Sequence, residues 1–273
     1  MKRSAKKAFL AFILFFIITA SASAFAAEGQ QQYRFFQFFV EDAAIIPTQW
    51  WEGQIRFISD GQYRSFNVPD SDTLAVSPIV AFSPRDDFEI GAILSVEDID
   101  YDSPLLNEKS GSGLSDTDIY GKYRIKKEPF ELTFGVLATL PTGDEDEGRG
   151  TGKMNLELFG AARKSIEHGM IINGVFGFRL NRDATLLGVA DLDAKTSVIL
   201  GGGFIYPMTQ TLALSGEISI ESERYEDADT DIRVTPGLQF KAFKNSLMRV
   251  GLGVGLTDGA PDFEAIASYA YTF

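Results

Sequence analysis

The sequence of 273 residues contains no cysteine and only one histidine, His168. Without cysteine, the chain can form no disulfide bond and offers no thiolate to a metal ion. Basic residues are also scarce: there are 25 Lys and Arg against 38 Asp and Glu, and the pI is near 4.6. Nucleic-acid binding needs a basic surface, so this function class is excluded.

Long apolar segments are almost absent as well. The one apolar run, 8–20, follows the basic residues Lys2, Arg3, Lys6 and Lys7 and precedes the small residues around 24–26. It is shorter than the roughly 18 to 20 residues of a membrane helix, so we predict a signal peptide over 1–26, cleaved before Ala27. Its removal takes four positive charges from a net charge of −13 and leaves −17. If the mature chain lies in a membrane, it must do so as a closed β-barrel.

The composition fits such a barrel. The chain has 26 glycines, 23 phenylalanines and a mean hydropathy of −0.01. In a transmembrane barrel half of the strand positions face a polar lumen, which brings the mean hydropathy close to zero.

The last eleven residues alternate between two faces. One face carries apolar and aromatic side chains and the other mostly small or polar ones, which is the pattern of a half-buried strand. The apolar face comprises Phe263, Ala265, Ala267, Tyr269, Tyr271 and Phe273. The aromatic residues at 269, 271 and 273 resemble the C-terminal signature of outer-membrane β-barrels, which implies recognition by the barrel assembly machinery.

Period-two alternation predicts about twelve strands in all. Most have a length close to the 9 to 11 residues that cross a bilayer when tilted. The predicted strands cover 51–59, 73–83, 88–95, 117–125, 130–140, 154–163, 170–180, 195–206, 212–222, 232–242, 247–256 and 263–273.

The connections between these strands alternate in length. Short turns at 83–87, 126–129, 165–169, 206–210 and 243–246 alternate with longer loops at 60–72, 96–116, 141–153, 181–194, 223–231 and 257–262. Bacterial barrels have short periplasmic turns, longer outer loops and an even number of strands. The predicted fold class is therefore all-β, an antiparallel transmembrane β-barrel over 50–273 with periplasmic termini. Residues 27–49 are interpreted as a periplasmic leader, with a short plug or an interfacial segment as alternatives.

Strand parity places sixteen charged residues on the inward face, seven acids and nine bases. Unpaired charge in a narrow lumen is costly, so opposite signs should pair. The pairs either plug the barrel or line a narrow wet pore, and twelve strands lie between the filled and the open barrel sizes. The predicted lumen-lining residues are Glu52, Arg56, Glu89, Lys122, Arg124, Glu131, Glu157, Arg163, Arg179, Lys195, Glu217, Glu221, Arg233, Lys241, Arg249 and Glu264.

Three stretches have the order and spacing of one family: IIPTQWWEGQIRF at 45–57, SGLSDTDIYGKYRI at 112–125 and LPTGDEDEGRGTGK at 140–153. Together they resemble the meta-pathway phenol-degradation family of outer-membrane proteins. The resemblance implies a channel or uptake pore for small solutes, with hydrophobic or aromatic compounds as a candidate class. It carries over no cofactor and no catalytic residue. The GTGK stretch lacks the spacing of a phosphate-binding loop and precedes a strand, so we discard nucleotide binding.

Two other functions stay open at this point. The first is a closed structural or adhesive barrel whose acidic loops are the functional part. The second is a lipid-modifying barrel enzyme, which needs a hydroxyl and an imidazole within hydrogen-bonding reach. His168 lies in a short turn and no second residue completes such a pair, so we expect no enzyme and no catalytic site.

The acidic loops, at 144–147 and 221–231, also suggest divalent cations. Neither loop has the spacing of a calcium loop, and a solvated acidic rim is the favoured interpretation, without a metal site. The expected location is the outer membrane, with lipid, lipopolysaccharide and small-molecule solutes as partners.

Phe273 should be required for assembly, because it closes the barrel against the first strand and presents the terminal aromatic side chain. Deleting it, or replacing it with Asp, should leave the protein in the periplasm. Heat-modifiable outer-membrane protein in normal amounts from either variant would contradict the assignment.

Overall fold

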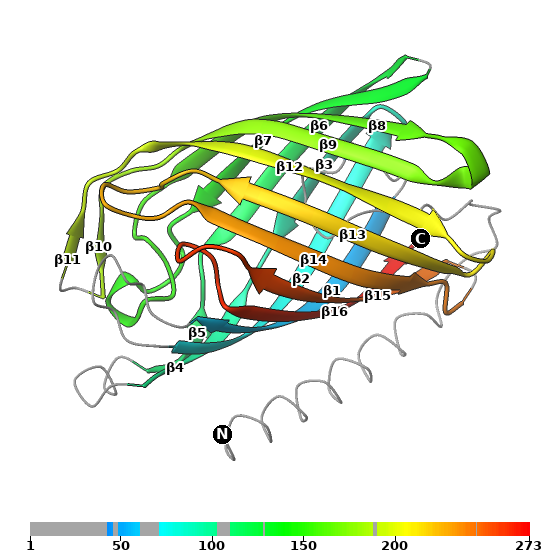
Figure 1. The fold of residues 1–273 in the computed structure, drawn as a ribbon. Coiled ribbons are helices and arrows are strands. Elements are labelled where there is room, and N and C mark those ends of the chain that lie inside the picture. Colours follow the sequence, from blue (N-terminus) through cyan, green and yellow to red (C-terminus); the bar gives the residue numbers. More distant parts are fainter. Residues whose placement is uncertain are drawn as a thin grey trace.

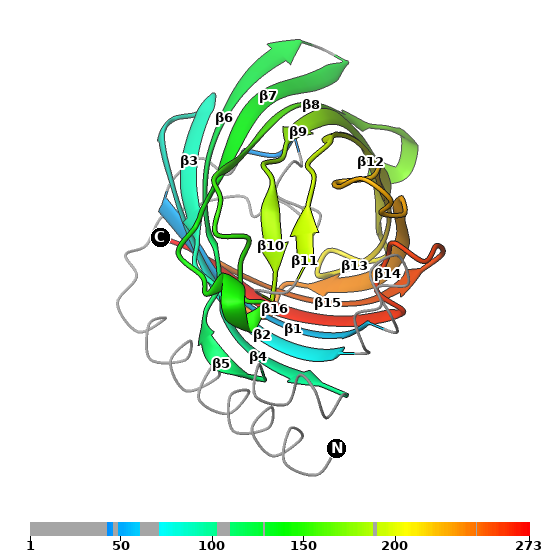
Figure 2. The same ribbon diagram turned by 90° about the vertical axis from the view of Figure 1, so that its left-hand side faces the viewer.

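The structure is a computed structural model that describes residues 43–45, 49–60, 71–102, 110–127, 129–187, 190–243 and 245–273. These residues form one closed antiparallel β-barrel, seen from the side in Figure 1 and end-on in Figure 2. No helix in these ranges has the length and apolar character needed to cross a membrane. The predicted signal peptide and most of 27–49 lie outside the described residues.

The strands follow one another as neighbours around the barrel. Two short 3-10 helices, η2 (Glu145–Glu147) and η3 (Glu167–Gly169), lie in connections. The strands are β1 (Gln49–Asp60), β2 (Ser71–Arg85), β3 (Phe88–Ile93), β4 (Val96–Tyr101), β5 (Gly111–Leu114), β6 (Thr117–Lys127), β7 (Phe130–Leu140), β8 (Asn155–Ser165), β9 (Ile171–Leu180), β10 (Ala184–Leu186), β11 (Ala190–Leu192), β12 (Thr196–Pro207), β13 (Leu212–Glu221), β14 (Asp231–Phe240), β15 (Ser246–Gly255) and β16 (Phe263–Thr272).

The predicted number of barrel strands is confirmed. The main sheet has fourteen segments, but β4 continues β3 and β5 leads into β6, so that these four segments make two long strands. The prediction of a loop over 96–116 is therefore wrong in part. The acidic stretch 96–101 and the glycine-rich stretch 111–114 have low strand propensity, and pairing with β2 and with each other outweighs it.

The barrel closes where its first and last strands meet. β1 pairs with β2 on one side and with β16 on the other, in an unbroken register from Trp50 opposite Thr272 to Ser59 opposite Phe263. The Phe273 N–H donates to the Gln49 carbonyl at 2.9 Å. Closure leaves no unpaired strand edge, which is the condition for a sheet in lipid.

The residues of the predicted assembly signal lie beside this closure. Tyr269 and Tyr271 are on the outward face of β16, since Ser268 and Ala270 face inward. The Tyr269 ring lies 5.8 Å from that of Trp51 on β1, and the Tyr271 ring lies 5.3 Å from that of Phe273, which is half exposed. Their role in assembly stays a prediction.

The two ends of the barrel differ. The end that carries Gln49, Phe273 and the short connections is called here the turn end, and the opposite end, with the longer connections, the loop end. The connections at the turn end are tight backbone turns. In η3, for example, His168 and Gly169 both have positive φ, 59° and 75°.

The outer surface is apolar along the strands. On β7 the side chain of Phe134 is 55% exposed whereas that of its neighbour Thr133 is fully buried, so the two side chains point to opposite faces. An apolar surface of this kind suits the hydrocarbon core of a bilayer. Other outward-facing apolar residues are Val80, Phe82, Ile90, Val136, Leu158, Phe176, Phe178, Leu200, Phe204, Leu214, Ile218, Leu238, Val250, Leu252 and Val254.

An arginine on the outward face should be costly. Phe134→Arg should lower the free energy of unfolding in lipid by about 2 to 4 kcal/mol, because its charge lies near the middle of the hydrocarbon layer. Ser219→Arg, on the inward and partly exposed face of β13, is the control and should change it little. Urea unfolding in vesicles measures both. A more destabilised Ser219→Arg would mean that inward and outward faces are exchanged.

Candidate functional site: the barrel lumen

Side chains of one parity line the lumen. On β8, Glu157, Phe159 and Ala161 are buried, whereas Leu158 between them is 51% exposed on the outer surface. Fourteen of the sixteen predicted lumen residues have the inward parity; Lys195 and Lys241 lie just outside β12 and β14. The fourteen are Glu52, Arg56, Glu89, Lys122, Arg124, Glu131, Glu157, Arg163, Arg179, Glu217, Glu221, Arg233, Arg249 and Glu264.

Three inward-facing acids were missed from the sequence: Glu97, Asp118 and Asp231. Asp118 shares the parity of Lys122, and Asp231 that of Arg233, so strand parity alone would have found both. Glu97 was assigned to a loop, and only recognition of β4 would have placed it. With these three, the inward-facing acids named here outnumber the inward-facing bases, ten to seven.

In the turn-end half of the lumen two ion pairs are deeply buried. Arg249 on β15 pairs with Glu52 on β1, and both side chains are 1% exposed. Arg249 Nε also donates to Ser268 Oγ at 3.1 Å. Lys122 Nζ lies 3.0 Å from Glu89 Oε1. Burying a charged side chain costs free energy, and in both pairs the close approach of the opposite charge offsets this cost.

Residues 43–45 lie inside the barrel between these pairs. The Ala43 carbonyl accepts a hydrogen bond from Thr133 Oγ1 at 2.8 Å, and the Ala44 carbonyl accepts one from Lys122 Nζ at 3.1 Å. All three residues are buried, and Ala43 packs against Ala161 and Val175. The interpretation of 27–49 as a periplasmic leader stays a prediction, since most of that segment lies outside the described residues. Gln49 already belongs to β1.

Apolar side chains fill the space around this segment. We call residues 43–45, the two ion pairs and this apolar cluster the septum. Trp50 joins its apolar and polar parts, since its indole Nε1 donates to Glu89 Oε2 at 3.3 Å. The cluster comprises Ala44, Trp50, Ile79, Ala81, Tyr120, Leu137, Ile205, Ala213, Leu247 and Ala270.

In the loop-end half the inward-facing charges are linked but partly exposed. Arg179 bridges Glu157 at 2.6 Å and Glu221 at 2.8 Å. Arg233 pairs with Asp231 and, at 3.3 Å, with Glu264. The exposed fractions of the Arg179 and Arg233 side chains, 19% and 25%, show that water reaches this half. We call it the vestibule.

Arg56 extends the vestibule network to β1. Its Nε lies 3.4 Å from Glu264 Oε1, and its side chain is 34% exposed. The wall formed by β12 and β13 carries small residues, and Gly201, Gly203 and Ser219 are only partly buried. On β8, two strands from β12, the buried ring of Phe159 packs beside Gly135 of β7, so bulk on the inward face differs between these parts of the wall.

The ion pairs reach beyond adjacent strands. Arg249 on β15 pairs with Glu52, two strands away across β16, and Glu221 on β13 pairs with Arg179 on β9, across β12, and with Arg224. Nearest-strand reasoning fails here because the long arginine side chains reach past one strand.

At the loop end two of the stretches that carry the family resemblance pack against each other. The Asp116 carboxylate accepts hydrogen bonds from the Gly143 N–H at 3.0 Å and the Thr151 N–H at 2.9 Å. Thr142 Oγ1 donates to the Ser115 carbonyl at 2.9 Å. The two motifs therefore form one structural unit at the rim.

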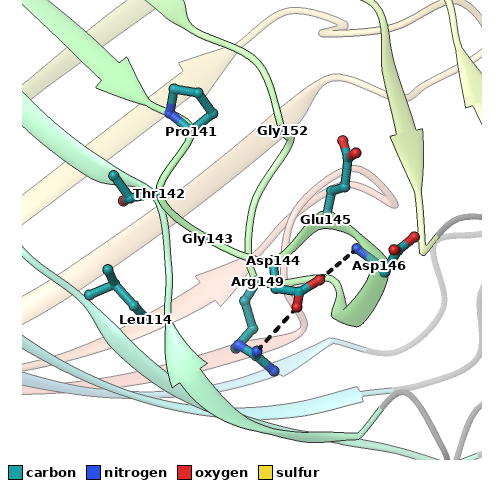
Figure 3. Close-up of a pocket in the computed structure, with 9 residues that line it drawn as sticks. All are labelled: Leu114, Pro141, Thr142, Gly143, Asp144, Glu145, Asp146, Arg149 and Gly152. Atoms are coloured by element: carbon teal, nitrogen blue, oxygen red, sulfur yellow. Dashed lines mark hydrogen bonds and ion pairs between the residues drawn. The ribbon is translucent and has the colours of Figure 1, made fainter.

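A hollow of about 560 Å³ opens beside this unit (Figure 3). Arg149, itself 7% exposed, pairs with Glu147 and lies 3.9 Å from Asp144. Asp144 also accepts from the Asp146 N–H at 3.0 Å. The lining residues are Leu114, Pro141, Thr142, Gly143, Asp144, Glu145, Asp146, Arg149 and Gly152.

The hairpin of β10 and β11 crosses the opening at the loop end, as Figure 2 shows. Leu187 and Leu192 are buried, at 1% and 6% exposure. Next to the hairpin, Lys195 Nζ donates to Glu223 Oε2 at 2.7 Å, and this hydrogen bond raises the pKa of Lys195. The hairpin narrows the entrance to the vestibule.

The other candidate residues lie apart from the lumen. His168 is exposed in η3 at the turn end. In the part of the chain that the structure describes, no group of three or more His, Asp or Glu side chains is placed to hold a metal ion.

Comparison with known proteins identifies the fold. No family model matches the sequence, and no curated protein sequence matches it. Among solved structures, an outer-membrane channel from Pseudomonas putida F1 superposes with a TM-score of 0.68 at 12% identity, covering 86% of this chain and 98% of that one. The NanC porin gives 0.52 at 10% identity, covering 83% and 99%, and the β domain of the Bordetella autotransporter BrkA gives 0.52 at 13%, covering 83% and 100%. The chain thus has the fold of outer-membrane β-barrels.

Breaking a septum ion pair should be costly. Arg249→Met should destabilise the barrel by about 3 to 5 kcal/mol, because it leaves the Glu52 carboxylate buried without its cation. The double variant Arg249→Met, Glu52→Leu should recover most of this loss. Lys195→Gln, which breaks an exposed pair, is the control and should leave stability unchanged. Urea unfolding in vesicles compares the variants, and a double variant no more stable than Arg249→Met would contradict this account.

Proposed function

We propose that the protein is an outer-membrane channel for small solutes, closed by the septum in the conformation described. The observation that carries this proposal is a water-accessible, charge-lined vestibule inside a barrel with an apolar outer surface. A passive channel needs only such a lumen and no cofactor. The likeness to the channel from Pseudomonas putida F1 supports the proposal.

The proposal includes the location of the protein and its partners. After removal of residues 1–26, the barrel would be inserted by the assembly machinery through the aromatic residues at 269, 271 and 273. Its outward apolar surface would contact membrane lipid, and its loop end would face lipopolysaccharide and the solutes. The length difference between turns and loops supports this orientation.

The substrate class is the least constrained part of the proposal. The resemblance to the phenol-degradation family favours small hydrophobic or aromatic compounds. The contact between the SGLSDTD and LPTGD motifs through Asp116 supports the resemblance, because it gives the two sequence motifs one structural role.

A closed structural or adhesive barrel is the second candidate, and the septum favours it. Ala213, Leu247 and Ala270 are fully buried at the turn end, and the two buried ion pairs lie there too. The two ion pairs run along the wall rather than across the lumen, so the apolar cluster and residues 43–45 are the parts that fill the interior. If this septum never opens, the acidic loops are the functional surface.

Conductance separates the two candidates. Deleting residues 27–46 removes Ala43–Ile45 from the septum and leaves the whole barrel from Gln49 onwards. We expect small or rare current steps from the wild type in planar bilayers and larger steps from this variant.

The matched control is deletion of 27–40, which keeps residues 43–45 and should conduct like the wild type. Heat-modifiable migration checks that each variant is folded. Folded wild type and folded 27–46 deletion that both carry no current would favour the structural barrel.

A further inference from the structure

The vestibule carries more negative than positive charge. Its inward-facing strand positions hold three arginines, Arg56, Arg179 and Arg233. Against them stand seven acids, and Arg224, just beyond β13, pairs with one of these acids, Glu221, so an excess of three negative charges remains when all are ionised. The seven acids are Glu97, Asp118, Glu157, Glu217, Glu221, Asp231 and Glu264.

This excess is confined to the loop-end half. In the septum the charges are matched one to one, since Glu52 pairs with Arg249 and Glu89 with Lys122. The deeper inward positions add Arg124, which lies 3.4 Å from Glu131, and Arg163, which lies opposite Glu131 in the register, so this half carries no negative excess. The negative field is therefore concentrated where a solute would enter.

The hollow above the vestibule has the same sign. Its lining includes the carboxylates of Asp144, Glu145 and Asp146 and a single cation, Arg149. Arg149 is already engaged by Glu147 and Asp144. In Figure 3 the Glu145 and Asp146 side chains extend away from Arg149, so their charge is not neutralised by it.

Within the vestibule two acids occupy positions that a passing solute would meet. Asp118 on β6 accepts a hydrogen bond from Thr139 Oγ1 at 2.6 Å. Glu217 on β13 lies in register between Gly203 and Thr235, on the wall that carries small residues. Since β7, β8, β9 and β12 separate β6 from β13, the two carboxylates contribute charge from different parts of the barrel wall.

We propose that the vestibule and the hollow above it select small organic cations, such as protonated amines, with Asp118 and Glu217 as specificity-determining residues. A water-filled channel with low-dielectric walls focuses the field of such charges and raises the local concentration of ions of opposite sign. The carboxylates do not converge as ligands of a metal ion, and a diffuse organic cation suits their spread. This inference rests on the proposed channel function and refines it by naming the charge of the solute.

Reversal potentials test the inference directly. With a gradient of ethylammonium chloride across a planar bilayer, the wild type should pass ethylammonium in preference to chloride. The double variant Asp118→Asn, Glu217→Gln should lower the ratio of cation to anion permeability by roughly threefold or more. If the double variant fails to fold, Glu217→Gln alone is measured and should shift the ratio in the same direction.

The matched control is Glu226→Gln, Asp227→Asn, which removes the same charge from an exposed loop at the same end of the barrel. It should shift the ratio much less. Chloride preference in the wild type, or equal shifts in the vestibule and loop variants, would overturn the inference. If neither the wild type nor the 27–46 deletion carries current, the proposed channel function itself fails.

Discussion

The constraint on which the structure depends is that every backbone N–H and carbonyl in contact with lipid must be paired inside the protein. The chain meets it by joining β16 to β1, the two strands furthest apart in the sequence. Only this pairing turns a sheet with two open edges into a wall without any. It also explains why the segment 43–45 enters the lumen, since the closure fixes Gln49 and Trp50 at the turn end immediately beside the opening.

A closed wall imposes a second requirement on the interior. The alternate side chains, which point away from lipid into the barrel, must share a narrow space. Bringing a charge into that space costs free energy unless an opposite charge pairs with it. The septum satisfies the requirement with close pairs such as Glu52 and Arg249, both almost inaccessible to water. The vestibule satisfies it differently, because water reaches Arg179 and Arg233 and solvates the charge that the pairs leave over.

The sequence predicted the barrel well because period-two alternation reports directly which face of a strand meets lipid. The 130–140 strand was predicted with its observed bounds, and Phe134 and Thr133 on it with their observed faces. Side-chain partners were much harder to predict. Parity says that Arg249 points inward, but its reach across β16 to Glu52 depends on barrel curvature and side-chain length, which no local pattern records. Likewise, β4 and the β10–β11 hairpin are stabilised by their neighbours rather than by strand propensity.

The parts of the septum differ in how firmly they are attached. The pairs Glu52–Arg249 and Glu89–Lys122 connect residues of the wall, and these residues keep their places as long as the barrel is closed. Residues 43–45 are held by hydrogen bonds to the Ala43 and Ala44 carbonyls and by three buried side chains, those of Ala43, Ala44 and Ile45. A neutral hydrogen bond contributes about 0.5 to 1.5 kcal/mol, and one from an ammonium group somewhat more. Withdrawal of this segment would therefore cost a few hydrogen bonds and the burial of one isoleucine and two alanine side chains, whereas opening the wall would cost a whole strand ladder. If the septum opens for a solute, the segment is the part that the barrel can release while remaining closed to lipid.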